Sequence, residues 1–180
     1  MKKFELTTEF ITNAFEKKLF RIKALIEFGN VKAGELGGFV EKEENLSHDG
    51  NAWVRENAVV CENAVVCGNA EVRENAVVRG NAEVRENAWV RENAEVCGNA
   101  VVCGNADYAC IKGFGTEFRH TTFYKTKEDG IGVKCGCFYG SLEQFREQVK
   151  ETRNGKIAKE YLMIADLMEY HFASEDSSNE

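Results

Sequence analysis

The stretch that decides the fold runs from Asn51 to Cys110 and reads NAWVRE NAVVCE NAVVCG NAEVRE NAVVRG NAEVRE NAWVRE NAEVCG NAVVCG NADYAC. It is one six-residue pattern, Asn-Ala-x-Val-x-(Gly/Glu), written ten times without an insertion. A short fixed period means that one structural unit is stacked on itself. Position two is always Ala and position four is Val in nine of the ten copies, whereas positions three and five vary. Constant small and β-branched residues two apart lie on one side of a strand, so the block predicts a β-solenoid with Ala and Val columns in its core.

The constant Asn at position one predicts a turn at each repeat boundary. Its short side chain tolerates left-handed backbone, and stacked Asn side chains form an amide ladder. The apolar spacing of three and four that a helix needs is missing from the block. The repeats are therefore expected to contain strands and turns only.

The period and pattern resemble the hexapeptide-repeat left-handed parallel β-helix, a triangular prism with three hexads in each coil. The handedness is implied by this resemblance alone, because general crossover rules favour the right hand. Asn45–Gly50 reads as a degenerate eleventh hexad. The prism then has just under four coils and is roughly 17 Å tall at about 4.8 Å per coil. Such a short prism has two open ends, which should need caps and partners.

Successive hexads fall on three faces in rotation, called A, B and C, with the hexad at Asn51 on face A. The outward side chains of face A then bring together the candidate ligand-binding residues Trp53, Arg55, Arg73, Trp89 and Arg91. One reading is a self-neutralising ladder with the neighbouring Glu column, in which a flank or a second subunit covers the tryptophans. The other reading is an aromatic and arginine patch suited to stacking a base and holding a phosphate.

Faces B and C display columns of Val and Cys at their outward positions. Exposed columns of this kind predict an association surface. Proteins of the hexapeptide-repeat type typically form homotrimers with parallel prisms, so the resemblance implies a homotrimer that uses faces B and C.

The seven cysteines do not predict disulfides. Cys61 and Cys97 share face B two coils apart, about 9.6 Å, which is beyond disulfide reach. Cys135 and Cys137 form a lone C-x-C without a second pair at zinc spacing. We therefore expect free thiols, no metal and no cofactor.

The flanks are not repeats, and they divide the chain into further parts. Residues 1–44 predict a short β cap that leads into the first coil, and residues 45–110 hold the β-helix. Residues 111–172 predict a β-hairpin around Lys127–Gly130 followed by two helices, the first opened by a capping box at Ser141–Gln144. Residues 173–180 read as a disordered, solvated tail. The expected class is therefore mainly β with a C-terminal α+β module.

Composition restricts the function. The formal net charge of −7 argues against a general nucleic-acid binder. There is no apolar run long enough to span a membrane and no signal-peptide core, so we expect a cytoplasmic protein. Proline is absent, as expected where nearly every backbone N–H has a ladder partner.

Over nearly its full length, the chain resembles small proteins common in bacteriophage and prophage genomes. The matching segments are AGELGGFVEKEENLS, the repeat array, TTFYKT, KCGCF and KEYL. The resemblance carries no catalytic residues to transfer. A phage origin implies action on the host, including inhibition of host defence, from within the host cytoplasm.

Three classes of function follow. The first is an enzyme of the acyltransferase type, for which His120 is the one candidate, because histidine is the natural general base. The second is a non-catalytic protein that sequesters a small anionic, nucleotide-like ligand with the face A residues and with Arg119 and His120. The third is a scaffold that blocks a host protein. We rank ligand capture first and do not expect an enzyme.

Overall fold

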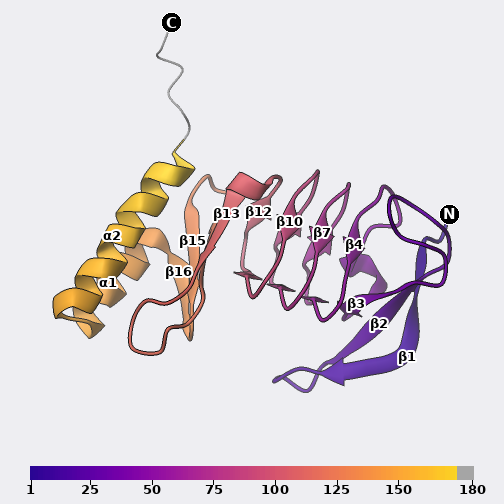
Figure 1. The fold of residues 1–180 in the computed structure, drawn as a ribbon, viewed down its shortest axis with the longest axis horizontal. Coiled ribbons are helices and arrows are strands. Elements are labelled where there is room, and N and C mark those ends of the chain that lie inside the picture. Colours follow the sequence, from indigo (N-terminus) through magenta and orange to yellow (C-terminus); the bar gives the residue numbers. More distant parts are fainter. Residues whose placement is uncertain (174–180) are drawn as a thin grey trace, which may run out of the picture.

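The computed structural model describes residues 1–173, and residues 174–180 of the predicted tail lie outside that range. The molecule is elongated, and the N-terminal strands, the coils and the C-terminal sheet with its helices follow one another along the long axis (Figure 1). The strands of the flanks are β1 (Phe4–Thr12), β2 (Lys18–Ala24), β3 (Leu36–Val40), β13 (Tyr108–Ile111), β14 (Thr121–Lys125), β15 (Ile131–Cys135) and β16 (Phe138–Ser141). The α-helices are α1 (Leu142–Thr152) and α2 (Gly155–Phe172).

The repeats form a β-solenoid of about four coils, as predicted. Strands one coil apart pair in parallel on each of the three predicted faces. Face A holds β4 (Trp53–Val54), β7 (Glu71–Val72) and β10 (Trp89–Val90). Face B holds β5 (Val59–Val60), β8 (Val77–Val78) and β11 (Glu95–Val96), and face C holds β6 (Val65–Val66), β9 (Glu83–Val84) and β12 (Val101–Val102). Leu46 bridges in parallel to Val66, so this segment joins the face C sheet. Leu46 therefore takes the place of a position-four Val, two positions out of register with the predicted hexad at Asn45–Gly50.

The Ala and Val columns fill the core. From Ala52 to Val102 every position-two Ala and position-four Val is fully buried. Burying a Val side chain contributes about 1.5–3 kcal/mol, so stacking the coils is driven mainly by these columns. The Asn side chains stack as predicted, with Asn51 Nδ2 donating to Asn69 Oδ1 at 3.1 Å and Asn69 Nδ2 to Asn87 Oδ1 at 3.1 Å.

The left-handed backbone lies at position six, and not at the Asn where it was expected. In the first eight hexads the position-six residues have φ between +56° and +77°, namely Glu56, Glu62, Gly68, Glu74, Gly80, Glu86, Glu92 and Gly98. Glycine adopts this region without penalty. Glutamate does not, and two of the Glu side chains offset the strain by accepting a backbone N–H one coil away, Glu62 from Gly80 at 2.8 Å and Glu74 from Glu92 at 2.7 Å.

The N-terminal flank closes one end of the solenoid. β1 and β2 form an antiparallel hairpin, β2 pairs with β3, and β3 pairs in parallel with β5, so this flank extends the face B sheet. The coil therefore begins at β3, earlier than the predicted boundary at residue 45. Leu19 and Phe39 of this flank bury Cys61 of face B.

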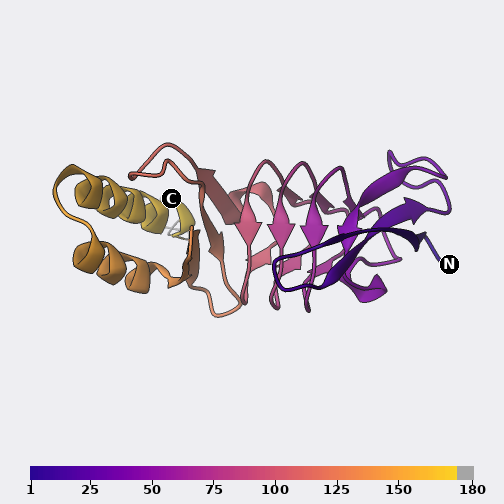
Figure 2. The same cartoon turned by 90° about the horizontal axis from the view of Figure 1, so that it is seen from below.

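The C-terminal flank closes the other end with the antiparallel sheet β13–β14–β15–β16. Tyr124 of this sheet belongs to the solenoid core, and its hydroxyl lies 3.1 Å from the buried Cys97 Sγ. The two helices lie side by side on the far side of the sheet from the coils (Figure 2). The predicted hairpin and helices are confirmed, and a tight turn at Gly136 and Cys137 adds a further strand, β16, after the hairpin.

Candidate functional site

Trp53 is buried, so it is not available to a ligand on face A as predicted. Its side chain is 0% exposed, because the N-terminal cap covers it with Phe4 and Phe28, whose rings meet it edge-on at 6.3 Å and 5.4 Å. This corrects the expectation that both tryptophans face a ligand. The Arg55 guanidinium is already paired, because it forms ion pairs with Glu35 at 2.8 Å and with Glu71 at 3.2 Å.

The remaining face A residues form a small patch. The Arg73 guanidinium lies 4.7 Å from the centre of the Trp89 ring, and Trp89 is 41% exposed. An Arg at position five pairs with the position-three residue one coil on, as Arg55 does with Glu71 and Arg79 with Glu95. These pairs differ from the predicted ladder, which joined the arginines to the Glu column at the corner. At Arg73 the position-three partner is Trp89, so the row of ion pairs is interrupted there. Arg91 is exposed on the next coil.

Arg119 and His120 lie in the C-terminal module, outside the face A patch. The His120 ring is half-buried, and its Nδ1 lies 3.7 Å from Cys110 Sγ. Arg119 lines a cavity of about 410 Å³, and His120 is not among the residues that line it. The structure therefore separates the predicted site residues into two groups and gives only Arg119 a place in a cavity.

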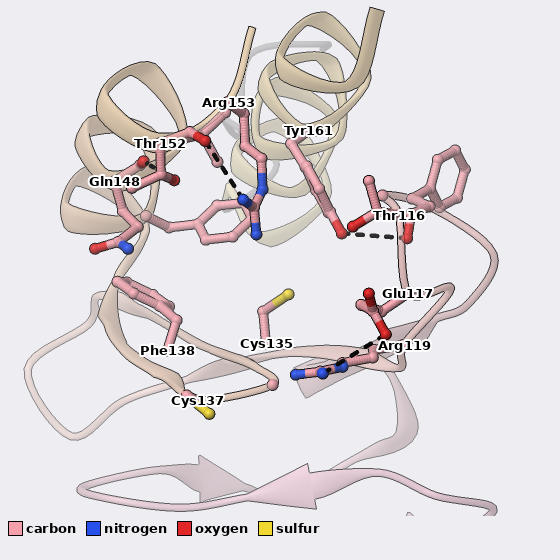
Figure 3. Close-up of a pocket in the computed structure, with 15 residues that line it drawn as sticks. Thr116, Glu117, Arg119, Cys135, Cys137, Phe138, Gln148, Thr152, Arg153 and Tyr161 are labelled. Carbon is pink, nitrogen blue, oxygen red and sulfur yellow. Dashed lines mark hydrogen bonds and ion pairs between the residues drawn. The ribbon is translucent and has the colours of Figure 1, made fainter.

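This cavity is formed where four segments of the C-terminal module meet (Figure 3). The loop after β13 forms one wall, the β15–β16 turn another, and α1 and α2 close it. Its lining includes the aromatic residues Phe114, Phe138, Phe145 and Tyr161, the polar residues Thr116, Glu117, Gln148 and Thr152, the thiols Cys135 and Cys137, and Arg119 and Arg153. It combines apolar walls with a few polar groups, as small-molecule sites do.

The two arginines approach the cavity from opposite sides, with Cys135 between them (Figure 3). Arg153 follows the end of α1, and the hydrogen bond from its Nη1 to the Thr152 carbonyl is long, at 3.4 Å. No ion pair joins Arg153 to a carboxylate within residues 1–173. Arg119 has one weak partner, Glu117 at 3.9 Å, which is 67% exposed. The cavity lining therefore holds two guanidinium groups and one carboxylate, Glu117, which leaves it with an excess of positive charge.

Two further groups fix the shape of the cavity. The Tyr161 hydroxyl donates to the Phe114 carbonyl at 3.2 Å, which ties the loop after β13 to α2. Burial raises the pKa of Tyr161 above its usual range, so the phenol keeps the proton that it donates to a higher pH than a solvated tyrosine does. Thr121 Oγ1 donates to Cys135 Sγ at 3.1 Å. That thiol is held on the cavity floor, whereas Cys137 is exposed on the turn.

Sequence reasoning missed Arg153, Tyr161 and Phe138 as site residues. Arg153 looks in the sequence like a polar residue at a helix end, and nothing in the pattern places it opposite Arg119. A usable signal was present in the quoted segments KCGCF and KEYL, because both contribute to the cavity lining. Those segments were interpreted only as architecture.

No protein-family model matches this chain, and no curated protein sequence shows significant similarity to it. Within residues 1–173 there is no group of three or more His, Cys, Asp or Glu side chains arranged to hold a metal ion. In the same part of the chain, neither helix has the length and apolar character needed to cross a bilayer.

Proposed function

We propose that this protein is a non-catalytic binding protein that captures a small anionic ligand in the cavity of its C-terminal module. The observation that carries the proposal is the entry of Arg119 and Arg153 into one aromatic-walled cavity from opposite sides. Two guanidinium groups near each other repel, and a bound anion relieves that repulsion. The fork of N–H donors on each guanidinium favours carboxylate or phosphate oxygens.

The two flanks close the ends of the solenoid, so the repeats act as a scaffold and the C-terminal module provides the binding site. Its constant positions are used for the core and its corners for turns, and its flanks supply the cavity. Capture needs affinity without turnover, and the cavity lacks the histidine that an acyltransferase would use, since His120 faces Cys110.

We further propose that the chain is a hexapeptide-repeat protein of the phage type, acting as a homotrimer in the host cytoplasm. A trimer would carry three equivalent cavities. In that setting the ligand would be a nucleotide-like signal of host defence, and the protein would act by sequestration. Cys61 and Cys97 are buried by the chain's own flanks, so a trimer interface on faces B and C would use the Val columns and face C thiols instead.

The test is a thermal-shift screen of the full chain against small phosphates, nucleotides and polycarboxylates. We expect at least one anion to raise the melting temperature of the wild type and to have little effect on Arg153→Gln. Arg91→Gln makes the same charge change on face A and should respond like the wild type. No shift with any anion, for a protein that is folded by circular dichroism, contradicts the proposal.

A second candidate function is favoured by the outer face of α2. Met163, Leu167 and Tyr170 recur at helical spacing and are 61%, 57% and 83% exposed. Met and Tyr are enriched in protein interfaces, and an exposed apolar face of this kind marks a contact surface. The alternative is therefore a scaffold that inhibits a host defence enzyme through α2. A stoichiometric host partner that is retained by Arg153→Gln and lost by Leu167→Glu would favour it over ligand capture.

A further inference from the structure

Building on the proposed function, we infer that the cavity selects an organic phosphate monoester with a single planar ring system, the size of a mononucleotide. The terminal phosphate lies between Arg119 and Arg153, and the ring lies among the aromatic side chains. Phosphate diesters and larger cyclic dinucleotides are poor ligands of this site.

Charge and geometry select the monoester. A phosphate monoester carries about −1.5 to −2 charges at neutral pH, enough to pair with both guanidinium groups although the exposed Glu117 carboxylate also lines the cavity. Because Arg119 and Arg153 stand on opposite sides of the cavity, the anion needs acceptor oxygens that point both ways (Figure 3). Three terminal oxygens on a tetrahedral phosphorus provide them. A diester carries one charge and only two terminal oxygens, and a monocarboxylate has its two oxygens in one plane.

The aromatic walls select a planar group. Phe138 and Phe145 are tilted against each other with ring centres 5.5 Å apart, and Phe145 meets Tyr161 edge-on at 5.7 Å. Rings prefer such offset and edge-on contacts with further rings. Inorganic phosphate would leave these walls without a partner, so the non-phosphate part of the ligand contributes to affinity.

Volume limits the size. The cavity of about 410 Å³ lies near the small end of the range of about 300–1,000 Å³ found for ligand pockets. It has room for one ring system with its sugar and phosphate. A second nucleotide unit would have to remain outside.

Cys135 supplies an internal reporter of occupancy, because its thiol lies between the two arginines. Cys67 on face C is half-buried like Cys135 but does not line the cavity, so it provides the matched control. A ligand in the cavity therefore slows alkylation of Cys135 by iodoacetamide more than alkylation of Cys67.

The experiment measures binding of AMP, 3′,5′-cyclic AMP, adenosine, inorganic phosphate, citrate and a cyclic dinucleotide to the full chain by titration calorimetry. We expect AMP to bind at least tenfold more tightly than each of the others and to protect Cys135, as read by peptide mass spectrometry. Arg119→Gln and Arg153→Gln should each weaken AMP binding at least tenfold, Arg153→Lys should also weaken it, and Arg91→Gln should leave it unchanged.

The outcomes separate the two proposals. If citrate or the cyclic dinucleotide binds best and still depends on Arg153, anion capture stands and the monoester inference is wrong. Equal binding of AMP and inorganic phosphate also overturns the inference, because the ring then contributes nothing. Binding of AMP that is lost in Arg91→Gln and kept in Arg153→Gln moves the site to face A and contradicts both. If no probe binds the folded protein, both fail.

Discussion

At the scale of single residues, position six of a hexad is constrained in two ways, by its left-handed backbone and by its close approach to the next coil. Gly80 has φ +77°, and a Cβ there would lie 2.7 Å from the backbone nitrogen of Gly98 on the next coil. We therefore expect Gly80→Ala to lower the free energy of unfolding by about 2–3 kcal/mol, from backbone strain and a clash together. Urea denaturation followed by circular dichroism measures the loss.

A substitution at Gly34 tests the backbone strain without the clash. It has φ +86°, and a Cβ there would meet no atom of the described residues within 4 Å. Gly34→Ala should therefore cost only the strain of the left-handed backbone, about 1 kcal/mol. Equal losses in the two variants would show that coil-to-coil contact at the corner is unimportant.

The two tryptophans occupy equivalent hexad positions but differ in burial. Trp53→Ala should cost about 3–5 kcal/mol of unfolding free energy, because it opens a cavity beneath the N-terminal cap. Trp89→Ala should cost less than about 1 kcal/mol, because the ring is 41% exposed. Trp53→Phe is the intermediate case, since it keeps a ring and removes an indole N–H that has no hydrogen-bond partner within the described residues. A similar loss for both alanine variants, in chemical denaturation, would contradict the assigned burial.

At the scale of the elements, the start of α1 was predictable in detail and its stability can be tested. Ser141 Oγ accepts from the Gln144 backbone at 3.3 Å, and Gln144 Oε1 accepts from the Ser141 backbone at 2.9 Å. Ser141→Ala should cost about 1 kcal/mol. Asn154 begins α2 without a side-chain cap bond, so Asn154→Ala should cost much less. The difference between the two melting temperatures is the readout, and the reverse order would refute the assignment.

The same contrast shows which parts of the fold and site the sequence predicts. The faces, the core columns and the capping box follow from local periodicity, and the structure agrees with them. The burial of Trp53 depends on Phe4 and Phe28, which arrive from a flank with no repeat. Arg153 and Arg119 line the same cavity only because a turn, a loop and two helices fold onto one sheet. Contacts of that kind leave no period in the sequence, so the cavity was missed while the solenoid was found.

At the scale of the whole molecule, both ends of the solenoid bury ionisable groups, and this gives stability a defined pH dependence. Burial raises the pKa of Cys61 from 9.0 to about 11 and also raises the pKa values of Cys97 and Tyr124. These groups lose protons first in the unfolded chain, so their contribution to stability is complete below about pH 9 and is lost as pH rises toward 11. We expect the urea midpoint of the wild type to fall between pH 8.5 and about 10.5. Cys61→Ala should show a shallower fall, and parallel curves would rule out this thiol as a cause.

Lys3, at the N-terminal end, makes the protein more stable as pH rises, which is the opposite of the effect of the buried thiols and Tyr124. Its Nζ donates to the Ala52 carbonyl at 2.9 Å and lies 4.7 Å from the Phe28 ring centre, and burial lowers its pKa from 10.5 to about 8. The folded chain therefore releases this proton before the unfolded chain does, so the contribution of Lys3 increases as pH rises from about 8 to 10.5. Lys3→Met removes that increase. The free-energy difference between wild type and Lys3→Met, measured by urea denaturation at pH 7.5 and pH 10, should grow with pH in favour of the wild type. A difference that is constant across this range would mean that Lys3 is solvated when the cap is closed.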